Sequence, residues 1–306
     1  MRPSCAAALS ALLLGHAGLS HAAGSAGAEP FNFLSLDANA RAVAMGGAYT
    51  ALATDANALL YNPAGLGRVD QTEATFMHNQ YLQGVNQEYL GLAARQGWGA
   101  NLNYLDSGSI PETTIASPSG TGASNSLTDM AVSAGYGRAV ADSLSLGAGA
   151  KYVQESVAGA NGRGYALDVG ALYAVPAVPR LTLGLAVRNI GPTVKFQSAN
   201  ENLPLDVRGG AAYAFDLLGQ RSVVSLDLSK ERSANAVVQG GFETVFVKMM
   251  AVRVGFNTGN DAGPKVTAGL GWTYRQFALD YAFVPYGDLG VSNRISVTVR
   301  WGDKKQ

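Results

Sequence analysis

The sequence predicts an all-β membrane protein: a transmembrane β-barrel of about fourteen antiparallel strands, with a short N-terminal helical hatch inside the lumen. Three observations predict this fold. The 306-residue chain is 47% hydrophobic but only 14% charged, and it holds 38 glycines, whereas soluble domains average about 25% charged residues. Apolar residues alternate with small or polar ones along most of the chain. The links between these alternating runs are short and long in turn.

The N-terminus has the layout of a cleaved secretory signal. Arg2 precedes an apolar stretch from Ala6 to Leu14, and Ser20 and Ala22 occupy the −3 and −1 positions of a cleavage site. The stretch is too short for a spanning helix, and an uncleaved anchor is the alternative. The predicted parts of the chain are a signal peptide (1–22), an N-terminal extension with a helical hatch (23–70), a transmembrane barrel (71–301) and a C-terminal tail (302–306).

Few residues suited to catalysis or metal binding follow this signal. Cys5, His16 and His21 leave with it, so His78 is the one histidine of the predicted mature chain. We therefore expect no disulfide, no metal site and no cofactor. A hydrolase would need a serine motif beside His78, and none is present, so we expect no enzyme. The balanced charge, without a basic run, argues against a nucleic-acid partner.

The alternating runs have the period of a β-strand. Within residues 181–188, four aliphatic side chains share one face, while Thr182, Gly184, Ala186 and Arg188 share the other. No run of 18 apolar residues follows the signal, so a closed barrel is the remaining way to cross a bilayer. A secreted soluble β protein is the alternative. The runs centre near Phe76, Leu92, Leu102, Val132, Ala148, Val169, Leu185, Ala211, Leu226, Phe242, Val254, Leu270, Tyr281 and Val297.

The links support a barrel, because outer-membrane barrels have short periplasmic turns and longer outer loops. The last run ends at Trp301. A final strand with a terminal aromatic residue resembles the signal that barrel-assembly machinery recognises, and the alternative is that Trp301 is only an interface anchor. Outer-membrane lipid and this machinery are the expected partners. The tight links are 95–97, 139–142, 175–180, 216–221, 247–249 and 275–276. The longer, polar links are 106–126, 155–162, 190–204, 230–235, 257–263 and 284–292.

Residues 41–66 do not alternate and instead have helical spacing. We expect a helix from Arg41 to Ala53, then a second short turn through Leu60 that Thr54 or Asp55 caps. Asn62-Pro63 stops this turn, and Gly65 allows the reversal into the first strand. A short, small-residue-rich helical segment that cannot span the bilayer is expected to plug the periplasmic end of the barrel.

Two other interpretations of this segment, as a nucleotide-binding loop or as a metal site, have little support in the sequence. A nucleotide-binding loop at Gly46-Gly47 lacks both a preceding strand and a following Lys-Ser/Thr. A metal pair of Asp55 and Asn57 lacks further acidic ligands at loop spacing.

Residues 39–66, "NARAVAMGGAYTALATDANALLYNPAGL", resemble the N-terminal signature of the PorV/PorQ family, within the FadL-like group of outer-membrane barrels. Later blocks such as "LSLGAGAKYV", "LTLGLAVRNIG" and "NRISVTVRW" follow in the order of the family. The resemblance implies a bacterial outer-membrane barrel with an N-terminal hatch. The matching hatch positions are Arg41, Gly46, Gly47, Asp55, Asn57, Asn62 and Pro63.

Two functions stay open. The resemblance to PorV implies a non-enzymatic role in protein secretion or surface attachment, with secreted cargo proteins docking on outer loops 107–126 and 191–204. The alternative is a FadL-like gated channel for uptake or export of small hydrophobic compounds, although the short first outer loop, 80–87, argues against fatty acids. Lumen charges would then form an ion-pair network more readily than a filter. They are Lys151, Asp168, Arg188, Asp227, Glu243, Arg253 and Asp280.

Overall fold

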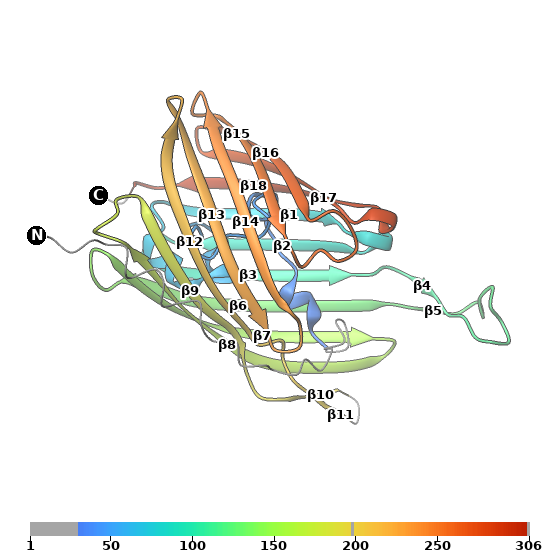
Figure 1. Ribbon diagram of the computed structural model, residues 1–306. Coiled ribbons are helices and arrows are strands. Elements are labelled where there is room, and N and C mark those ends of the chain that lie inside the picture. The colour runs from blue at the N-terminus through green and yellow to red at the C-terminus, as the bar shows by residue number, and fades with distance from the viewer. Residues whose placement is uncertain (1–29, 197–198, 305–306) are drawn as a thin grey trace, which may run out of the picture.

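The computed structural model describes residues 30–196 and 199–304, and the predicted signal peptide lies outside them. Fourteen strands close into an antiparallel barrel (Figure 1), which confirms the predicted fold class. The first strand pairs with the last, from Thr72 opposite Trp301 to Gln80 opposite Asn293. No helix in the described part of the chain is long and apolar enough to cross a membrane.

All fourteen predicted strand centres fall within the barrel strands. The barrel strands are β1 (Thr72–Gln80), β2 (Asn86–Ala93), β3 (Trp98–Asp106), β6 (Leu127–Ala139), β7 (Leu144–Val157), β8 (Ala160–Ala174), β9 (Leu181–Ile190), β12 (Asp206–Leu217), β13 (Gln220–Glu231), β14 (Ala236–Phe246), β15 (Met250–Asn257), β16 (Val266–Tyr274), β17 (Phe277–Pro285) and β18 (Val291–Trp301). Two hairpins stand outside the barrel sheet, β4 (Ile110–Pro111) with β5 (Ser124–Asn125) and β10 (Val194–Phe196) with β11 (Ala199–Glu201).

The apolar side chains of the alternating runs point outward. On β16, Leu270 is 57% exposed and Trp272 is 45% exposed, while the intervening positions face the interior. Exposed aromatic side chains gather near one end of the barrel, at Trp98, Tyr136, Tyr173, Tyr213, Trp272, Tyr274, Phe277 and Trp301. An apolar outer surface bordered by aromatic residues is the surface that a barrel presents to lipid and its interfaces.

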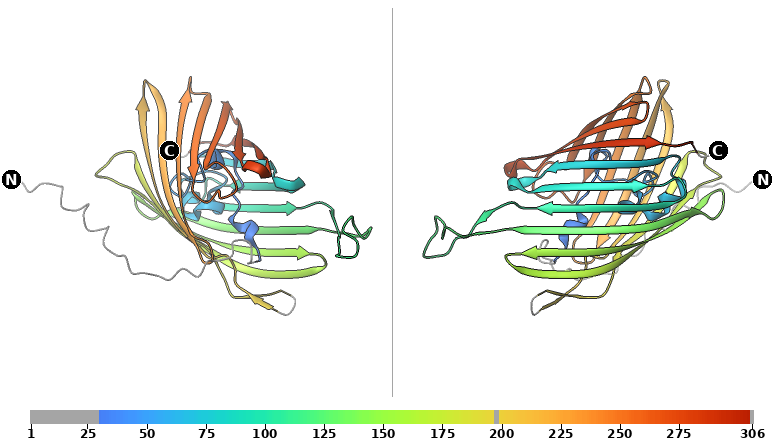
Figure 2. Two further views of the ribbon diagram at one scale, coloured as in Figure 1. Left: turned by 45° about the vertical axis from the view of Figure 1, so that its right-hand side comes forward. Right: turned by 180° about the vertical axis from the view of Figure 1, so that it is seen from behind.

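The two ends of the barrel differ in their links. At the short-turn end the strands are joined by residues 94–97, 140–143, 175–180, 218–219, 247–249 and 275–276. At the long-loop end they are joined by residues 81–85, 107–126, 158–159, 191–205, 232–235, 258–265 and 286–290. Figure 2 shows the β4–β5 hairpin, within 107–126, projecting away from the barrel.

One of the predicted longer loops is wrong. Strands β7 and β8 pair as far as Val157 and Ala160, so Ala158 and Gly159 alone form the turn in place of a loop over 155–162. Ala158 has φ 47° and Gly159 has φ 83°, and two consecutive residues with positive φ form the tight turns that suit the twist of a hairpin.

The N-terminal region runs through the lumen as short helical pieces, so the hatch lies inside the barrel (Figure 1). The pieces are η1 (Asn32–Ser35), α1 (Ala40–Ala44), α2 (Ala58–Tyr61) and η2 (Pro63–Arg68). Two further 3-10 turns, η3 (Leu82–Gly84) and η4 (Gly287–Leu289), lie in links at the long-loop end. We call residues 30–37 the N-terminal segment and residues 38–69 the hatch.

The predicted helix from Arg41 to Ala53 is wrong in length, because α1 ends at Ala44. Gly46 has φ 69° and Gly47 has φ 86°, and left-handed backbone of this kind terminates an α-helix. The glycines also let the chain approach the wall. A Cβ on Gly46 would lie 2.7 Å from the carbonyl oxygen of Gly240.

The second helical turn differs from its prediction only in part. Asp55 accepts a hydrogen bond from the Asn57 amide at 3.0 Å, as predicted for a capping residue, although the α-helix begins only at Ala58. Asn62 and Pro63 do end this turn, but Pro63 starts η2, so the chain does not reverse at Gly65. Glycine is needed at position 65 because the Ala53 backbone lies so close that a Cβ there would collide with the Ala53 carbonyl oxygen.

The chain crosses the lumen from the long-loop end to the short-turn end. The N-terminal segment contacts Glu155 and Glu231, near the long-loop ends of β7 and β13. Met45 lies against Gly241 at the middle of β14. Arg68 reaches the short-turn end, where it donates a hydrogen bond to the carbonyl oxygen of Ser143 at 2.8 Å. The hatch therefore extends further along the barrel than the predicted periplasmic plug.

Candidate functional site in the barrel lumen

The hatch backbone touches the barrel wall at glycines. A Cβ built on Gly241 would lie 2.6 Å from the Met45 carbonyl oxygen, and one built on Gly137 would lie 2.6 Å from the Pro63 carbonyl oxygen. No real Cβ fits so close to an oxygen, so any residue other than glycine would push the hatch from the wall. Other wall glycines whose Cβ would meet the hatch backbone are Gly91, Gly147, Gly184 and Gly255.

Glu243 of β14 connects the hatch to the wall by charge. Its carboxylate accepts hydrogen bonds from the Arg41 guanidinium at 2.9 and 2.7 Å and from Arg253 at 2.5 Å. Arg253 also binds Asp280 at 2.7 Å, so arginines and carboxylates alternate from the hatch to β17. Burial lowers the pKa of Arg41, but the charges of Glu243, Tyr49 and Asp55 and the hydrogen bond to Glu243 together outweigh burial and leave that pKa raised. Arg41 therefore stays charged inside the lumen.

Other wall side chains bind the backbone of the hatch. Asp227 of β13 accepts hydrogen bonds from the amides of Tyr49 and Thr50 at 3.0 and 2.8 Å. Arg188 of β9 donates to the carbonyl oxygen of Leu60 at 2.8 Å. Short helical pieces leave many amide and carbonyl groups unpaired, and these two charges satisfy several of them. The hatch is thus held by hydrogen bonds as well as by shape.

The seven predicted lumen charges all face the interior. They are Lys151, Asp168, Arg188, Asp227, Glu243, Arg253 and Asp280, and each is buried. Lys151 lies 3.1 Å from Asp168, and Arg188 lies 2.6 Å from Asp206. The structure thus places six of the seven in ion pairs, while Asp227 binds hatch amides. Their role in transport stays a prediction.

The seven predicted hatch positions all lie within the lumen. They are Arg41, Gly46, Gly47, Asp55, Asn57, Asn62 and Pro63. Asp55 accepts from the Tyr49 hydroxyl and from the Asn57 amide, which keeps this part of the hatch compact. The Asn62 side chain donates to the carbonyl oxygen of Ala171 on β8 at 3.0 Å. A gating role for these positions stays a prediction.

Several lumen residues were missed by the sequence analysis. Asp206, Arg208 and Arg294 are buried and face the interior, and counting in steps of two along their strands would have placed them there. Glu73, which binds Arg300 at 2.8 Å, lies in the weakly patterned first strand, where the same count gives no clear face. His78, considered as a catalytic base, instead points outward and pairs with Glu88 at 2.7 Å.

The N-terminal segment fills an apolar pocket in the lumen at the long-loop end. Phe31, Phe33 and Leu34 are each no more than 4% exposed. They form one cluster with Leu105, Ala131, Val153, Ala166, Val194 and Leu203. Two hydrogen bonds hold the segment to the wall, from the Phe31 amide to Glu155 and from the Ser35 hydroxyl to Glu231. Apolar contact therefore accounts for most of its attachment.

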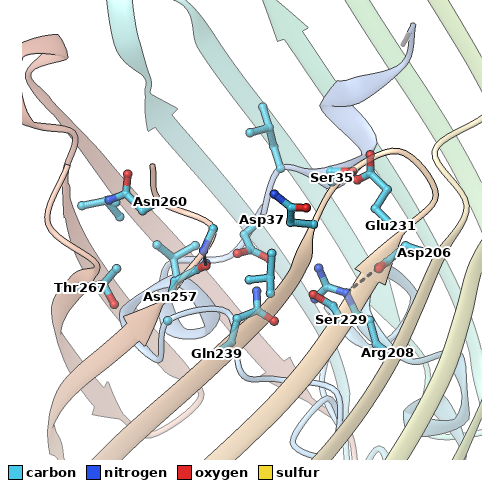
Figure 3. Close-up of a pocket in the computed structure, with 18 of the residues that line it drawn as sticks. Ser35, Asp37, Asp206, Arg208, Ser229, Glu231, Gln239, Asn257, Asn260 and Thr267 are labelled. Atoms are coloured by element: carbon cyan, nitrogen blue, oxygen red, sulfur yellow. Dashed lines mark hydrogen bonds and ion pairs between the residues drawn. The ribbon is translucent and has the colours of Figure 1, made fainter. Parts of the chain in front are cut away.

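A polar chamber of about 290 Å³ lies beside the N-terminal segment, toward the long-loop end (Figure 3). Asp37 projects into it from the segment, and Asp206 and Arg208 project from β12. The Asp206 carboxylate accepts from Arg208 at 2.6 Å and from Arg188 at 2.6 Å. Further lining residues are Glu231, Gln239, Asn257, Asn260, Tyr81, Tyr286 and Arg294.

An apolar groove of about 580 Å³ lies across β6, β7, β8 and the end of β9. Its outward-facing lining includes Val132, Tyr165 and Leu167, which are 45%, 69% and 56% exposed. The ladder between β8 and β9 is irregular here, with a register shift between Leu167 and Val169. Pairing with β9 ends where Leu167 meets Ile190, so the groove lies where the wall is least regular.

Comparison with protein families matches residues 16–161, slightly less than half of the chain, to an uncharacterised protein family, UPF0164. A UPF0164 protein of Treponema pallidum (strain Nichols) is 29% identical over 175 residues, which are 53% of this chain and 44% of that protein. The chain therefore spans less than half the length of this relative.

Comparison with solved structures shows the fold of FadL-like outer-membrane barrels. The monoaromatic hydrocarbon channel CymD has a TM-score of 0.59 and 12% identity, covering 86% of this chain and 97% of that one. The Pseudomonas putida toluene transporter TodX has a TM-score of 0.56 and 14% identity, covering 86% and 96%. A Pseudomonas aeruginosa FadL homologue has a TM-score of 0.55 and 11% identity, covering 84% and 96%. The resemblance to PorV/PorQ stays a prediction.

Proposed function

We propose that the protein is a gated channel of the outer membrane for small apolar compounds, with the short-turn end in the periplasm. The observation that carries this proposal is that two apolar sites lie on opposite faces of the same part of the barrel wall. The pocket of the N-terminal segment uses the inward residues Ala131, Val153 and Ala166. The outer groove uses their immediate neighbours Val132 and Tyr152, with Tyr165.

These two sites are separated only by the thickness of the strands, because successive side chains on a strand point to opposite faces. Ion pairs and backbone contact with the wall obstruct the straight route through the hatch. An apolar compound would instead replace Phe31 and Phe33 in the inner pocket and leave through the irregular β8–β9 ladder. Similarity in fold to the hydrocarbon channels supports this function over protein secretion.

Locking the β8–β9 ladder tests the route. Cys5, in the predicted signal, is the chain's single cysteine, so an engineered pair has no competing thiol in the mature protein. Leu167→Cys with Ile190→Cys places thiols on directly opposed residues, a separation that a disulfide can bridge. We expect oxidation to reduce uptake of radiolabelled toluene into proteoliposomes at least several-fold, and reduction to restore it.

The matched control is Leu270→Cys with Tyr281→Cys, an opposed and outward-facing pair on β16 and β17. It should form its disulfide without changing uptake. Equal uptake by the oxidised and reduced β8–β9 variant would exclude this exit. Uptake no faster than in protein-free liposomes would exclude the channel itself.

A further inference from the structure

Arg294 of β18 is a buried cation without a partner in the described structure. Its side chain lines the polar chamber and the residue is 3% exposed. Its Nε atom has no hydrogen-bond partner, and no ion pair involves it among the residues that the structure describes. The lumen arginines Arg41, Arg188 and Arg253, by contrast, each bind a carboxylate at 2.7 Å or less. A buried charge without a counterion is costly, so Arg294 provides a place for an anion.

Arg208 points into the same chamber with spare donor capacity. Its Nε binds Asp206 at 2.6 Å, whereas its Nη1 has no partner in the described structure. Tyr61 of the hatch lies within electrostatic range of these groups. Burial raises the pKa of this tyrosine, the charge of Asp37 raises it further, and the charges of Arg208 and Arg294 lower it.

In the described structure, none of the carboxylates that line the chamber forms an ion pair with Arg294. The lining holds two guanidinium groups, Arg208 and Arg294, and three carboxylates, Asp37, Asp206 and Glu231. Asp206 already binds Arg188 and Arg208, and Glu231 accepts a hydrogen bond from the Ser35 hydroxyl. The unpartnered donors are guanidinium N–H groups, which suit carboxylate and phosphate oxygens.

We propose that the chamber binds the carboxylate or phosphate group of a small ligand between Arg208 and Arg294. Gln239 and Asn260 line the same space, so their amide side chains lie beside the other polar groups of a bound ligand. The chamber volume of about 290 Å³ lies at the lower limit of small-molecule sites. This binding site goes beyond the channel and does not depend on transport.

Binding to the full chain in detergent tests the proposal. Benzoate and phenyl phosphate carry the two anionic groups, and benzyl alcohol is a neutral aromatic of similar size. By calorimetry we expect at least one of the anions to bind at least about tenfold more tightly than the alcohol, as hydrogen bonds to charged groups allow. Arg294→Gln should remove this preference, whereas Asp37→Asn should strengthen anion binding because it removes the opposing charge.

Arg294→Gln and Asp37→Asn each remove one charge but should change anion binding in opposite directions. A general loss of folding would weaken binding in both variants. Arg163→Gln, which changes an exposed outward arginine of β8, is the matched control and should bind as the wild type does. Equal affinity for both anions and the alcohol, or unchanged anion binding in Arg294→Gln with the barrel folded, would overturn the proposal. Anion binding without toluene uptake would reject the channel and leave this site intact.

Discussion

The hatch and the N-terminal segment lie in the same lumen but are held in different ways. The hatch is attached by the Arg41–Glu243 ion pair, by amides bound to Asp227 and by direct backbone contact with wall glycines. The segment is attached mainly by Phe31 and Phe33 in an apolar pocket. Polar and steric attachment is specific to one partner, whereas an apolar pocket accepts any apolar occupant of suitable size. We therefore expect the N-terminal segment, more than the hatch, to be exchangeable for a ligand.

The largest expected effect comes from removing the charge that both Arg41 and Arg253 share. Glu243→Gln removes a counterion from the buried Arg253 and from Arg41, whose side chain is 31% exposed, and breaking a buried pair costs about 3–5 kcal/mol. Urea unfolding in detergent, followed by gel mobility of the folded barrel, measures this loss. Asp216→Asn, which breaks an exposed pair with Arg180, should leave the midpoint unchanged. Similar midpoints for both variants would mean that the hatch is not held by charge.

A smaller effect is expected from contact between the hatch backbone and the wall. Gly46 and Gly84 both have positive φ, at 69° and 82°, so alanine costs each about 1–2 kcal/mol in backbone strain. At Gly46 the Cβ also meets the Gly240 carbonyl oxygen at 2.7 Å, while at Gly84 nothing lies within 4 Å. Gly46→Ala should therefore destabilise the barrel by about 1–3 kcal/mol more than Gly84→Ala in the same unfolding assay. Equal losses would show that the hatch does not press on the wall.

The smallest change in stability is expected in the N-terminal segment. Phe33→Ala removes a buried ring, but a segment held mainly by apolar contact can detach locally, so global unfolding should shift by only about 1 kcal/mol. Toluene binding by calorimetry should instead tighten, because an emptied apolar site binds apolar ligands. Ile115→Ala, at an exposed position outside the barrel, should change neither quantity. A loss as large as that of Glu243→Gln would mean that segment and hatch form one unit.

Much of the fold was predictable because alternation is a local property. All fourteen strand centres, the closed barrel and the interior location of the hatch follow from the spacing of apolar residues and the lengths of the links. The same counting placed seven charges in the lumen. It failed where backbone conformation decides the outcome, as at Gly46 and Gly47, where two left-handed residues end a helix that side-chain spacing alone would continue.

Alternation along each strand is enough to predict which side chains face lipid and which face the lumen, because a period of two assigns every residue of a strand to one side of the wall. Which lumen groups contact one another depends instead on how the closed barrel and the hatch fit together. Arg41 and Glu243 are 202 positions apart, and their contact depends on closure of the barrel and on the depth of the hatch within it. The isolation of Arg294 is decided in the same way, because a missing partner is a property of the closed lumen and not of any one strand.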